Sequence, residues 1–270
     1  MQEITINDLL VAGAHFGHLT RRWNPKMKKY IFMERNGIHI IDLKKTLELL
    51  KEAQKAVIDI VREGDSILFV GTKNQAKDII KVEAERCGQF YITERWLGGT
   101  LTNFSTIKKS IKRMKNLQKM ATDGTYEKLT KKEILSRERE LAKLTKVLGG
   151  IQDMNRLPGA LFVVDTKKEQ IAVAEANRLG IPVIGMVDTN ADPTPIDFPI
   201  PCNDDAFKSI ALITRAISDA VLEAKSGVAE AEQAQVEGGA EAAETAAAAE
   251  AQKEGGDAGV EAKEETPVTE

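Results

Sequence analysis

Short, continuous apolar runs that alternate with amphipathic segments are the feature that most constrains the fold of this chain. The runs SILFVG, ALFVVDT and IPVIGMVD are separated by helical patterns such as NQAKDIIKVEAERCG and KKEQIAVAEANRLG. Strands that are apolar on both faces are typical of a parallel sheet covered by helices on both sides. We therefore predict an α/β fold with a Rossmann-like three-layer parallel sheet.

Two local elements are expected near the N-terminus. INDLLVAGAHFG has the pattern of a short amphipathic helix that begins at Asn7 or Asp8, and His15 lies late in it, where packing is the expected role. The β-rich arms of YIFMERNGIHIID flank Asn36 and Gly37, a dipeptide that strongly favours a two-residue hairpin turn. A β-hairpin is therefore predicted after the helix.

Between residues 103 and 148 the alternation of strands and helices stops. Apolar residues recur there at helical spacing, namely Ile107, Ile111, Met114, Leu117, Ile134, Leu141, Leu144 and Leu148. Thr130 and Glu133 have the spacing of a capping box at the start of a second helix. We predict an antiparallel coiled-coil helical hairpin at 103–148, inserted into an α/β globular domain formed by 1–102 and 149–225.

The C-terminal segment, residues 226–270, differs from the rest of the chain. It contains 12 acidic and two basic residues, a net charge of −10, and consists mostly of Ala, Glu and Gly. Such a segment buries too little apolar surface to offset the entropy of ordering, so we predict a disordered acidic tail. The preceding 225 residues hold 36 basic and 29 acidic residues, so the body carries a net charge of +7.

Targeting and redox signals are weak in this sequence. No run of 18 or more apolar residues occurs, and the N-terminus has no basic region followed by an apolar stretch. A membrane span and a secretory signal are therefore not expected, and we predict a cytoplasmic protein. Cys87 and Cys202 lie far apart without CxxC spacing, which favours reduced thiols in or near a core.

Motifs for enzymatic chemistry are also weak. Gly71 lies between a strand and a helix in ILFVGTKNQAK, but neither G-x-G-x-x-G nor G-x-x-x-x-G-K-[ST] is present, so a simple turn residue is favoured. The sequence has no G-x-S-x-G motif and suggests no histidine partner for either cysteine. We expect no enzyme and no small-molecule substrate. A nucleotide-dependent α/β enzyme that uses Gly71 and strand-end aspartates is the alternative.

Five aspartates follow predicted strands, and parallel strands bring such residues to one edge of the sheet: Asp165, Asp188, Asp192, Asp204 and Asp205. In the favoured interpretation Asp204 and Asp205 cap the final helix and Asp192 belongs to a turn. In the alternative, Asp188, Asp204 and Asp205 hold a divalent metal such as zinc, and His18 joins them if the N-terminal segment folds over this edge. No other cofactor is expected.

Basic residues are concentrated in the predicted hairpin. Residues 101–146 contain 13 Lys or Arg and five acidic residues, and no acidic residue lies between Thr100 and Ala121. A solvated helix pair normally mixes both signs, so this pattern favours a surface that binds phosphates. The candidate RNA-binding residues of the hairpin are Lys108, Lys109, Lys112, Arg113, Lys115 and Lys119.

A second basic group lies in HFGHLTRRWNPKMKKY, residues 15–30. Its candidate RNA-binding residues are Arg21, Arg22, Lys26, Lys28 and Lys29, with Arg95 as a further candidate in ERWLGGTLTNF. Basic residues beside aromatic rings suit RNA, because bases stack on rings while phosphates pair with cations. Packing is the first interpretation of Trp23 and Trp96. A protein-docking surface near Trp96 and His18 is a further hypothesis.

Several long segments together resemble the bacterial small-subunit ribosomal protein two family, the universal S-two family. They are LLVAGAHFGHLTRRWNPKMKKYIF, ILFVGTK, ERWLGGTLTNF, LGGIQDMNRLPGALFVVDTKKEQIAVAEANRLGIPVIGMVDTNADP and IPCNDDA. They occur in the family's order from about residue 4 to residue 225, with the hairpin between the expected blocks. Only the acidic tail has no counterpart in the pattern.

This resemblance implies a structural protein of the small ribosomal subunit that functions in translation. Its body would be Rossmann-like with a protruding coiled coil. It would contact small-subunit ribosomal RNA and neighbouring small-subunit proteins, and help recruit the messenger-binding ribosomal protein S-one. The resemblance supports phosphate binding by the hairpin and by residues 21–29 without assigning individual contacts.

Overall fold

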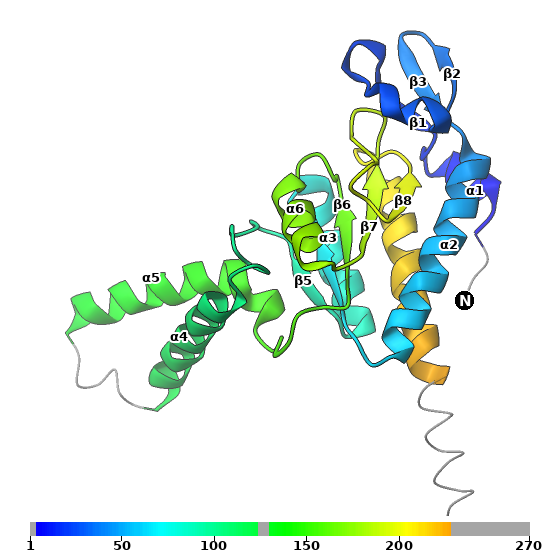
Figure 1. Cartoon of the computed structure of the whole chain (residues 1–270). Helices are drawn as coiled ribbons and strands as arrows, with labels where there is room; N and C mark the ends of the chain where they lie inside the picture. The colour runs from blue at the N-terminus through cyan, green and yellow to red at the C-terminus, as the bar shows by residue number, and fades with distance from the viewer. Residues whose placement is uncertain (1–3, 124–129, 228–270) are drawn as a thin grey trace, which may run out of the picture. The chain divides into compact units, whose positions relative to one another are not determined.

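The computed structural model describes residues 4–123 and 130–227. Its larger sheet has five parallel strands in the order β5-β4-β6-β7-β8 (Figure 1). The strands are β4 (Ile67–Val70), β5 (Phe90–Ile92), β6 (Ala160–Val164), β7 (Val183–Val187) and β8 (Phe198–Pro201). The predicted α/β fold with a parallel sheet is confirmed, and the strand order is that of flavodoxin-like doubly wound sheets. The predicted disordered tail falls almost entirely outside the described residues.

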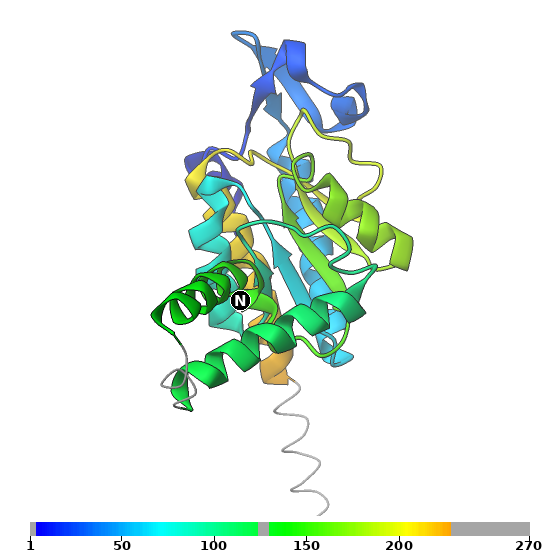
Figure 2. The ribbon, with the colours of Figure 1, turned by 90° about the vertical axis from the view of Figure 1, so that its left-hand side faces the viewer.

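Helices cover both faces of this sheet (Figures 1 and 2). On one face lie α2 (Leu43–Arg62), α3 (Asn74–Cys87) and a last helix at 207–227, and on the other lies α6 (Gln170–Leu179). Buried apolar side chains form one cluster on each face, because successive residues of a strand point to opposite sides. We call the cluster beside α2 and α3 the first cluster and the cluster beside α6 the second cluster.

A smaller sheet lies near the N-terminus. Its strands are β1 (Phe16–Leu19), β2 (Ile31–Arg35) and β3 (Ile38–Ile41), antiparallel in the order β1-β3-β2. Asn36 and Gly37 both have left-handed backbone angles, with φ of 54° and 73°, so the predicted hairpin turn is confirmed. The strand β1 was not predicted. Two short 3₁₀ helices, Thr20–Arg22 and Pro25–Tyr30, connect it to β2.

The first helix begins and ends earlier than predicted. α1 covers Ile6–Val11, and the hydroxyl of Thr5 accepts a hydrogen bond from the backbone N–H of Asp8 at its N-terminus. The predicted starts at Asn7 or Asp8 are therefore wrong, because Asp8 is the third residue of a capping box that Thr5 opens. His15 is not in the helix either. Gly13, with φ of 74°, turns the chain before His15, whose ring lies 4.0 Å from that of Phe16.

The segment between β5 and β6 forms two helices, α4 (Phe104–Thr122) and α5 (Lys131–Leu148), which contact each other and run in opposite directions (Figure 1). The predicted capping box of Thr130 and Glu133 is confirmed. Ile107, Ile111 and Met114 join the second cluster, which fixes α4 to the body. Coiled-coil packing of the pair stays a prediction, and part of its predicted connection, residues 124–129, lies outside the described residues.

Gly71 leaves space for packing between β4 and α3. A Cβ atom at this position would lie 2.2 Å from Cδ1 of Ile80 and 3.3 Å from Cβ of Val164. Because protein cores are densely packed, a larger residue would have to displace the side chain of Ile80 and would press on Val164. Close packing is therefore sufficient to explain a glycine at position 71, and no phosphate-binding role is needed.

Candidate nucleic-acid interface and the polar cluster at the sheet edge

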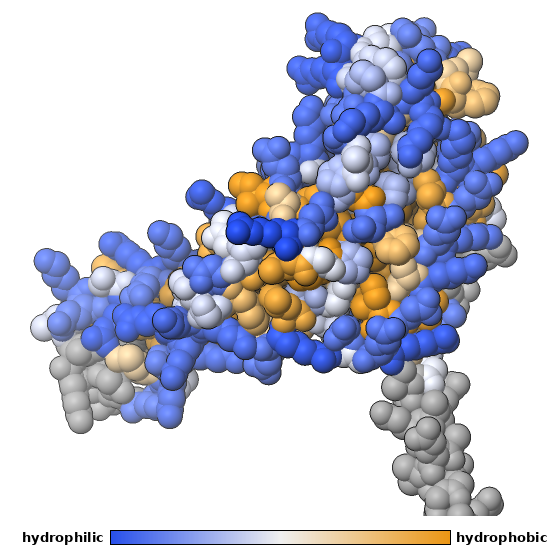
Figure 3. All heavy atoms as spheres, viewed as in Figure 1, coloured by the Kyte–Doolittle hydropathy of each residue, from blue (hydrophilic) through white to orange (hydrophobic). Residues whose placement is uncertain are grey.

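All six predicted RNA-binding residues of the helix pair are exposed, and Figure 3 shows hydrophilic residues over most of the visible surface of α4 and α5. Three of them bind oxygen atoms of neighbouring residues: Lys108 at the carbonyl of Asn155, Arg113 at Glu140 (3.1 Å) and Lys115 at Asp153 (2.9 Å). The side chains of the other three have no hydrogen-bond or ion-pair partner within the described residues: Lys109, Lys112 and Lys119. We call these three residues the hairpin surface.

The five predicted residues of the N-terminal arm are also exposed. Lys26 is paired with Asp192 at 2.7 Å, and the ammonium of Lys29 lies 4.7 Å from the ring centroid of Tyr30. The side chains of the other three have no hydrogen-bond, ion-pair or ring partner in the described part of the chain: Arg21, Arg22 and Lys28. We call these three residues the arm surface.

The arm is held against the body by backbone and packing contacts. The N–H of Asn24 donates to the carbonyl of Thr189 at 2.8 Å, and Met27 is fully buried in the second cluster. The ring of Trp23 lies 5.0 Å from that of His39, so Trp23 packs within the N-terminal segment. The arm surface is therefore presented by a segment with a fixed path.

Residues 93–103 connect β5 to α4, and one carboxylate organises the part from residue 96 to residue 102. Arg95 is exposed, whereas Trp96 is 7% exposed, as the packing interpretation expects. Glu175 on α6 is 8% exposed and accepts five hydrogen bonds from this segment. The donors are Nε1 of Trp96 (3.0 Å), the N–H groups of Gly99 (2.8 Å), Leu101 (2.9 Å) and Thr102 (3.1 Å), and Oγ1 of Thr102 (3.1 Å).

Burial alone would raise the pKa of Glu175. The hydrogen bonds from Trp96 and from the backbone N–H groups outweigh burial, so the pKa lies below its ordinary value of 4.5 and the side chain is ionised at neutral pH. An ionised acceptor of five donors fixes the geometry of the segment from which α4 begins.

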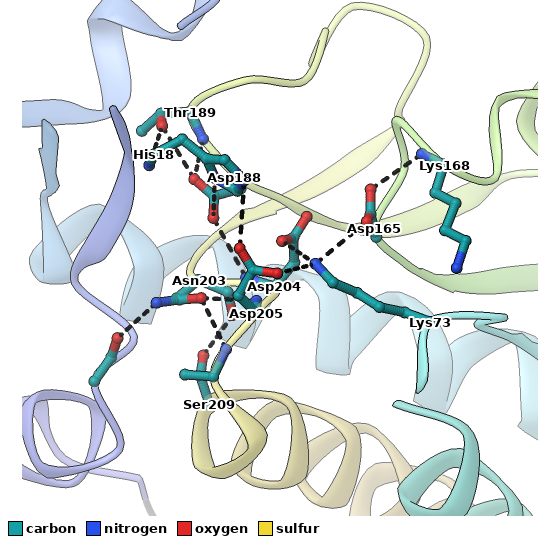
Figure 4. A network of polar contacts seen from close by, with 12 residues as sticks. His18, Lys73, Asp165, Lys168, Asp188, Thr189, Asn203, Asp204, Asp205 and Ser209 are labelled. Carbon is teal, nitrogen blue, oxygen red and sulfur yellow. Dashed lines mark hydrogen bonds and ion pairs between the residues drawn. The ribbon is translucent and has the colours of Figure 1, made fainter. Parts of the chain in front are cut away.

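At the carboxyl edge of the sheet, four of the predicted aspartates gather around a lysine that sequence reasoning missed (Figure 4). The ammonium of Lys73, which follows β4, contacts three of them: Asp165 (3.3 Å), Asp204 (2.8 Å) and Asp205 (2.6 Å). Its pair with Asp165, which follows β6, spans the position between β4 and β6 where the strand order reverses. Folds with this strand order commonly bind ligands at that position.

His18 reaches the same cluster from β1, so the N-terminal segment does fold over this edge. Its Nδ1 lies 3.0 Å from a carboxylate oxygen of Asp188, and its Nε2 lies 3.3 Å from one of Asp205. The backbone N–H of His18 also donates to Oγ1 of Thr189 at 2.8 Å. Of the two residues of the predicted docking surface, His18 is partly exposed at this edge, whereas Trp96 is buried in the second cluster.

The predicted capping role of Asp204 and Asp205 is wrong. Oδ1 of Asn203 accepts hydrogen bonds from the N–H groups of Asp205 (2.7 Å) and Ala206 (3.0 Å) where the last helix begins. The two aspartates contact Lys73 instead, and Asp205 also contacts His18. A cationic donor forms a stronger hydrogen bond with a carboxylate than a neutral backbone N–H group does. Asp192 does belong to a turn, in which it accepts from the N–H of Thr194 at 2.9 Å.

The charges of this cluster are strongly coupled. Burial, together with the carboxylates of Asp188 and Asp165, raises the pKa of Asp204 to about 7 in spite of Lys73. The hydrogen bond to Asp188 raises the pKa of His18, although burial opposes it. Burial lowers the pKa of Lys73, but Asp204 and the other carboxylates outweigh it, so this pKa is raised. The cluster therefore retains cationic groups or protons near neutral pH.

A family model described as ribosomal protein S2 matches residues 9–224. The matched region contains both sheets and the helix pair, and it covers most of the chain. The chain therefore belongs to the ribosomal protein S2 family. It is accordingly a structural protein of the small ribosomal subunit with a role in translation.

Within residues 4–123 and 130–227, none of the helices is long and apolar enough to cross a membrane.

Proposed function

We propose that this chain binds small-subunit ribosomal RNA through the hairpin surface and the arm surface. The observation that carries the proposal is a set of six exposed cations that have no protein partner within the described residues. An exposed cation without a partner can pair with a phosphate and release counterions without breaking a contact inside the protein. Lys26, Lys29, Lys108, Arg113 and Lys115 contribute less, because the side chain of each gives up an existing contact.

Salt dependence tests this proposal. The affinity of the full chain for small-subunit ribosomal RNA is expected to fall steeply as salt rises, by about a thousandfold between 50 and 200 mM if some six phosphates are contacted. Filter binding at several salt concentrations measures the slope. An affinity that hardly changes with salt would refute phosphate binding by these surfaces.

We propose further that the body acts as a scaffold, without an enzymatic activity or a small-molecule substrate, in cytoplasmic ribosomes. At the edge where a doubly wound sheet would bind a nucleotide, the ammonium of Lys73 bonds to carboxylates of the chain itself. The N–H of Thr72 likewise donates to Glu169 at 3.0 Å. The ammonium of Lys73 and the N–H of Thr72 are the kind of donors that a bound phosphate would need, and both are already bonded within the chain. This favours a scaffold over a nucleotide-dependent enzyme.

Docking of ribosomal protein S-one and of neighbouring small-subunit proteins is a proposal that rests on the family resemblance. His18 is the accessible residue of the predicted docking surface, with 19% of its side chain exposed. His18→Ala is expected to reduce the amount of S-one recovered with tagged chain on small subunits. Unchanged recovery would remove His18 from the docking surface.

A divalent metal such as zinc is a second proposal for the cluster at the sheet edge. Ligand atoms of His18, Asp188 and Asp204 lie within 4.8 Å of one another. Oδ2 of Asp204 is buried and has no hydrogen-bond partner, so it has free capacity to bind a cation. One imidazole nitrogen and carboxylate oxygens fit zinc, and Asp205 could contribute a further oxygen because it already contacts His18.

The metal proposal predicts a thermal shift. Zinc in excess over the chain is expected to raise the melting temperature of the metal-stripped full chain by several degrees, since a free ligand at about 100 times its Kd stabilises by about 2.7 kcal/mol. Asp204→Asn should abolish the shift, whereas the exposed variant Asp59→Asn should retain it. Elemental analysis of purified chain without zinc, combined with no shift, would refute the site.

A further inference from the structure

A pocket of about 600 Å³ lies between α6 and the segment that follows β7. Four side-chain amides line it: Asn24, Gln170, Asn177 and Asn190. Its apolar wall includes Val173 and Ile196, which are 3% and 6% exposed. A pocket of this size with an apolar wall and several amides suits a planar, polar heterocycle better than an aliphatic chain.

The amides are partly fixed and still have free hydrogen-bonding groups. Nδ2 of Asn177 donates to the carbonyl of Pro195 at 2.9 Å, and Oδ1 of Asn24 accepts from the N–H of Lys26 at 3.0 Å. These contacts orient the two amides and leave the Oδ1 of Asn177 and the Nδ2 of Asn24 available. The exposed amide of Gln170 has no partner within the described residues. The pocket therefore offers both donors and acceptors, as the edge of a nucleobase requires.

The charges around the pocket favour a ligand that carries phosphates. Asp192 lines the pocket, but its carboxylate is paired with the ammonium of Lys26 at 2.7 Å. Lys167 also lines it, is exposed and has no partner in the described part of the chain. The local acidic charge is thus balanced by one cation, while a second cation remains available for a phosphate.

One residue that lines the pocket belongs to the same N-terminal segment as the arm surface. Asn24 lines the pocket and lies two residues after Arg22, on the arm segment that the carbonyl of Thr189 fixes to the body. A strand of RNA whose phosphates bind Arg21 and Arg22 would therefore pass the mouth of the pocket. Proteins that read RNA in sequence commonly take an unpaired base out of such a strand.

We infer that this pocket holds one unpaired base of the RNA strand that binds the arm surface. The inference rests on the proposed RNA binding and adds a place where base identity is read. The amides would bind the base edge, Val173 and Ile196 would cover its face, and Lys167 would bind a flanking phosphate. A bound protein segment is the competing occupant, and the experiment distinguishes the two.

The test fills the pocket without removing a charge. Ala174 lines the pocket at an exposed position of α6, so Ala174→Leu narrows it without changing the core. Ala142→Leu, at an exposed position of α5 outside the pocket, is the matched control. Gln170→Ala is a second variant that removes only an exposed side chain. The affinity of each full-chain variant for small-subunit ribosomal RNA is measured across salt concentrations. Dimethyl sulfate and carbodiimide are used to probe which unpaired bases of the RNA are protected.

Ala174→Leu and Gln170→Ala are each expected to weaken binding about tenfold, as loss of one bound base does, with the salt slope unchanged because no cation is lost. One base that the wild-type chain and Ala142→Leu protect should become reactive with Ala174→Leu. If both variants bind the RNA and protect its bases as the control does, the inference is overturned, even if the variants impair binding of another ribosomal protein. Salt-dependent RNA binding by the wild-type chain would still support the proposed function in that case. Failure of the wild-type chain to bind the RNA would overturn both.

Discussion

Glu175→Gln is expected to destabilise the folded chain by about 3 kcal/mol, because a buried acceptor of several hydrogen bonds would lose its charge and one acceptor atom. The amide group of glutamine would place N–H groups opposite donors from Trp96 and from residues 99–102. Among residues 4–123 and 130–227, these donors have no hydrogen-bond acceptor other than Glu175. Urea unfolding of the full chain, followed by tryptophan fluorescence, measures the loss because Trp96 is one of the donors.

Glu52→Gln is the control, since Glu52 is exposed on α2 and the same replacement there should change stability by less than about 0.5 kcal/mol. The pH dependence provides a second check. The pKa of Glu175 is lowered in the folded chain, so its stabilisation is complete above the ordinary value of 4.5 and is lost as the pH falls through the folded-state value. The difference between wild type and Glu175→Gln should therefore shrink in acid. A loss of less than 1 kcal/mol at neutral pH would contradict the account.

Reversing the charges of the hairpin surface is expected to weaken binding to small-subunit ribosomal RNA about 100-fold or more at 150 mM salt. The variant is Lys109→Glu, Lys112→Glu and Lys119→Glu combined. Each lost phosphate contact should also lower the slope of log affinity against log salt by about 1. Filter binding with the full chain measures both quantities, and circular dichroism checks that α4 still forms.

The matched control reverses three exposed lysines on the opposite face of the sheet, Lys55, Lys81 and Lys208. Both triple variants change the net charge equally, so a difference between them reports where the RNA binds rather than the total charge. A further comparison is Lys112→Ala against Lys115→Ala. Lys115 is paired with Asp153, so its removal should weaken binding less. Equal losses for the two triple variants would show that the hairpin surface has no special role.

Features set by neighbouring residues were predictable from the sequence. The turn at Asn36 and Gly37 depends on two adjacent residues that adopt positive φ. The capping box at Thr130 and Glu133 depends only on residues within one turn of a helix. The buried strands were recognisable because their apolar runs need no partner to be identified. The end of α1 was misjudged although Gly13 marks it, because the apolar pattern continues past the glycine to Phe16.

Features that depend on distant parts of the chain were not predictable. β1 exists because Phe16 and Leu19 pair with Ile40 and Ile38, and four residues alone have too little pattern to show a strand. Sequence reasoning brought the aspartates to one edge but missed Lys73, which reads as an ordinary lysine before a helix. Glu175 gave one usable signal, a charged residue among the buried positions of α6 beside Ala172 and Ala176.

Sedimentation of the tagged full chain through a sucrose gradient tests most directly whether it works as a ribosomal RNA-binding component of the small subunit. The wild-type chain is expected to travel with the small subunit at physiological salt, whereas the hairpin-surface triple variant should remain largely near the top of the gradient. The control triple variant should travel with wild type. Wild-type chain that stays at the top, or a hairpin-surface variant that sediments as fully as wild type, would contradict the account.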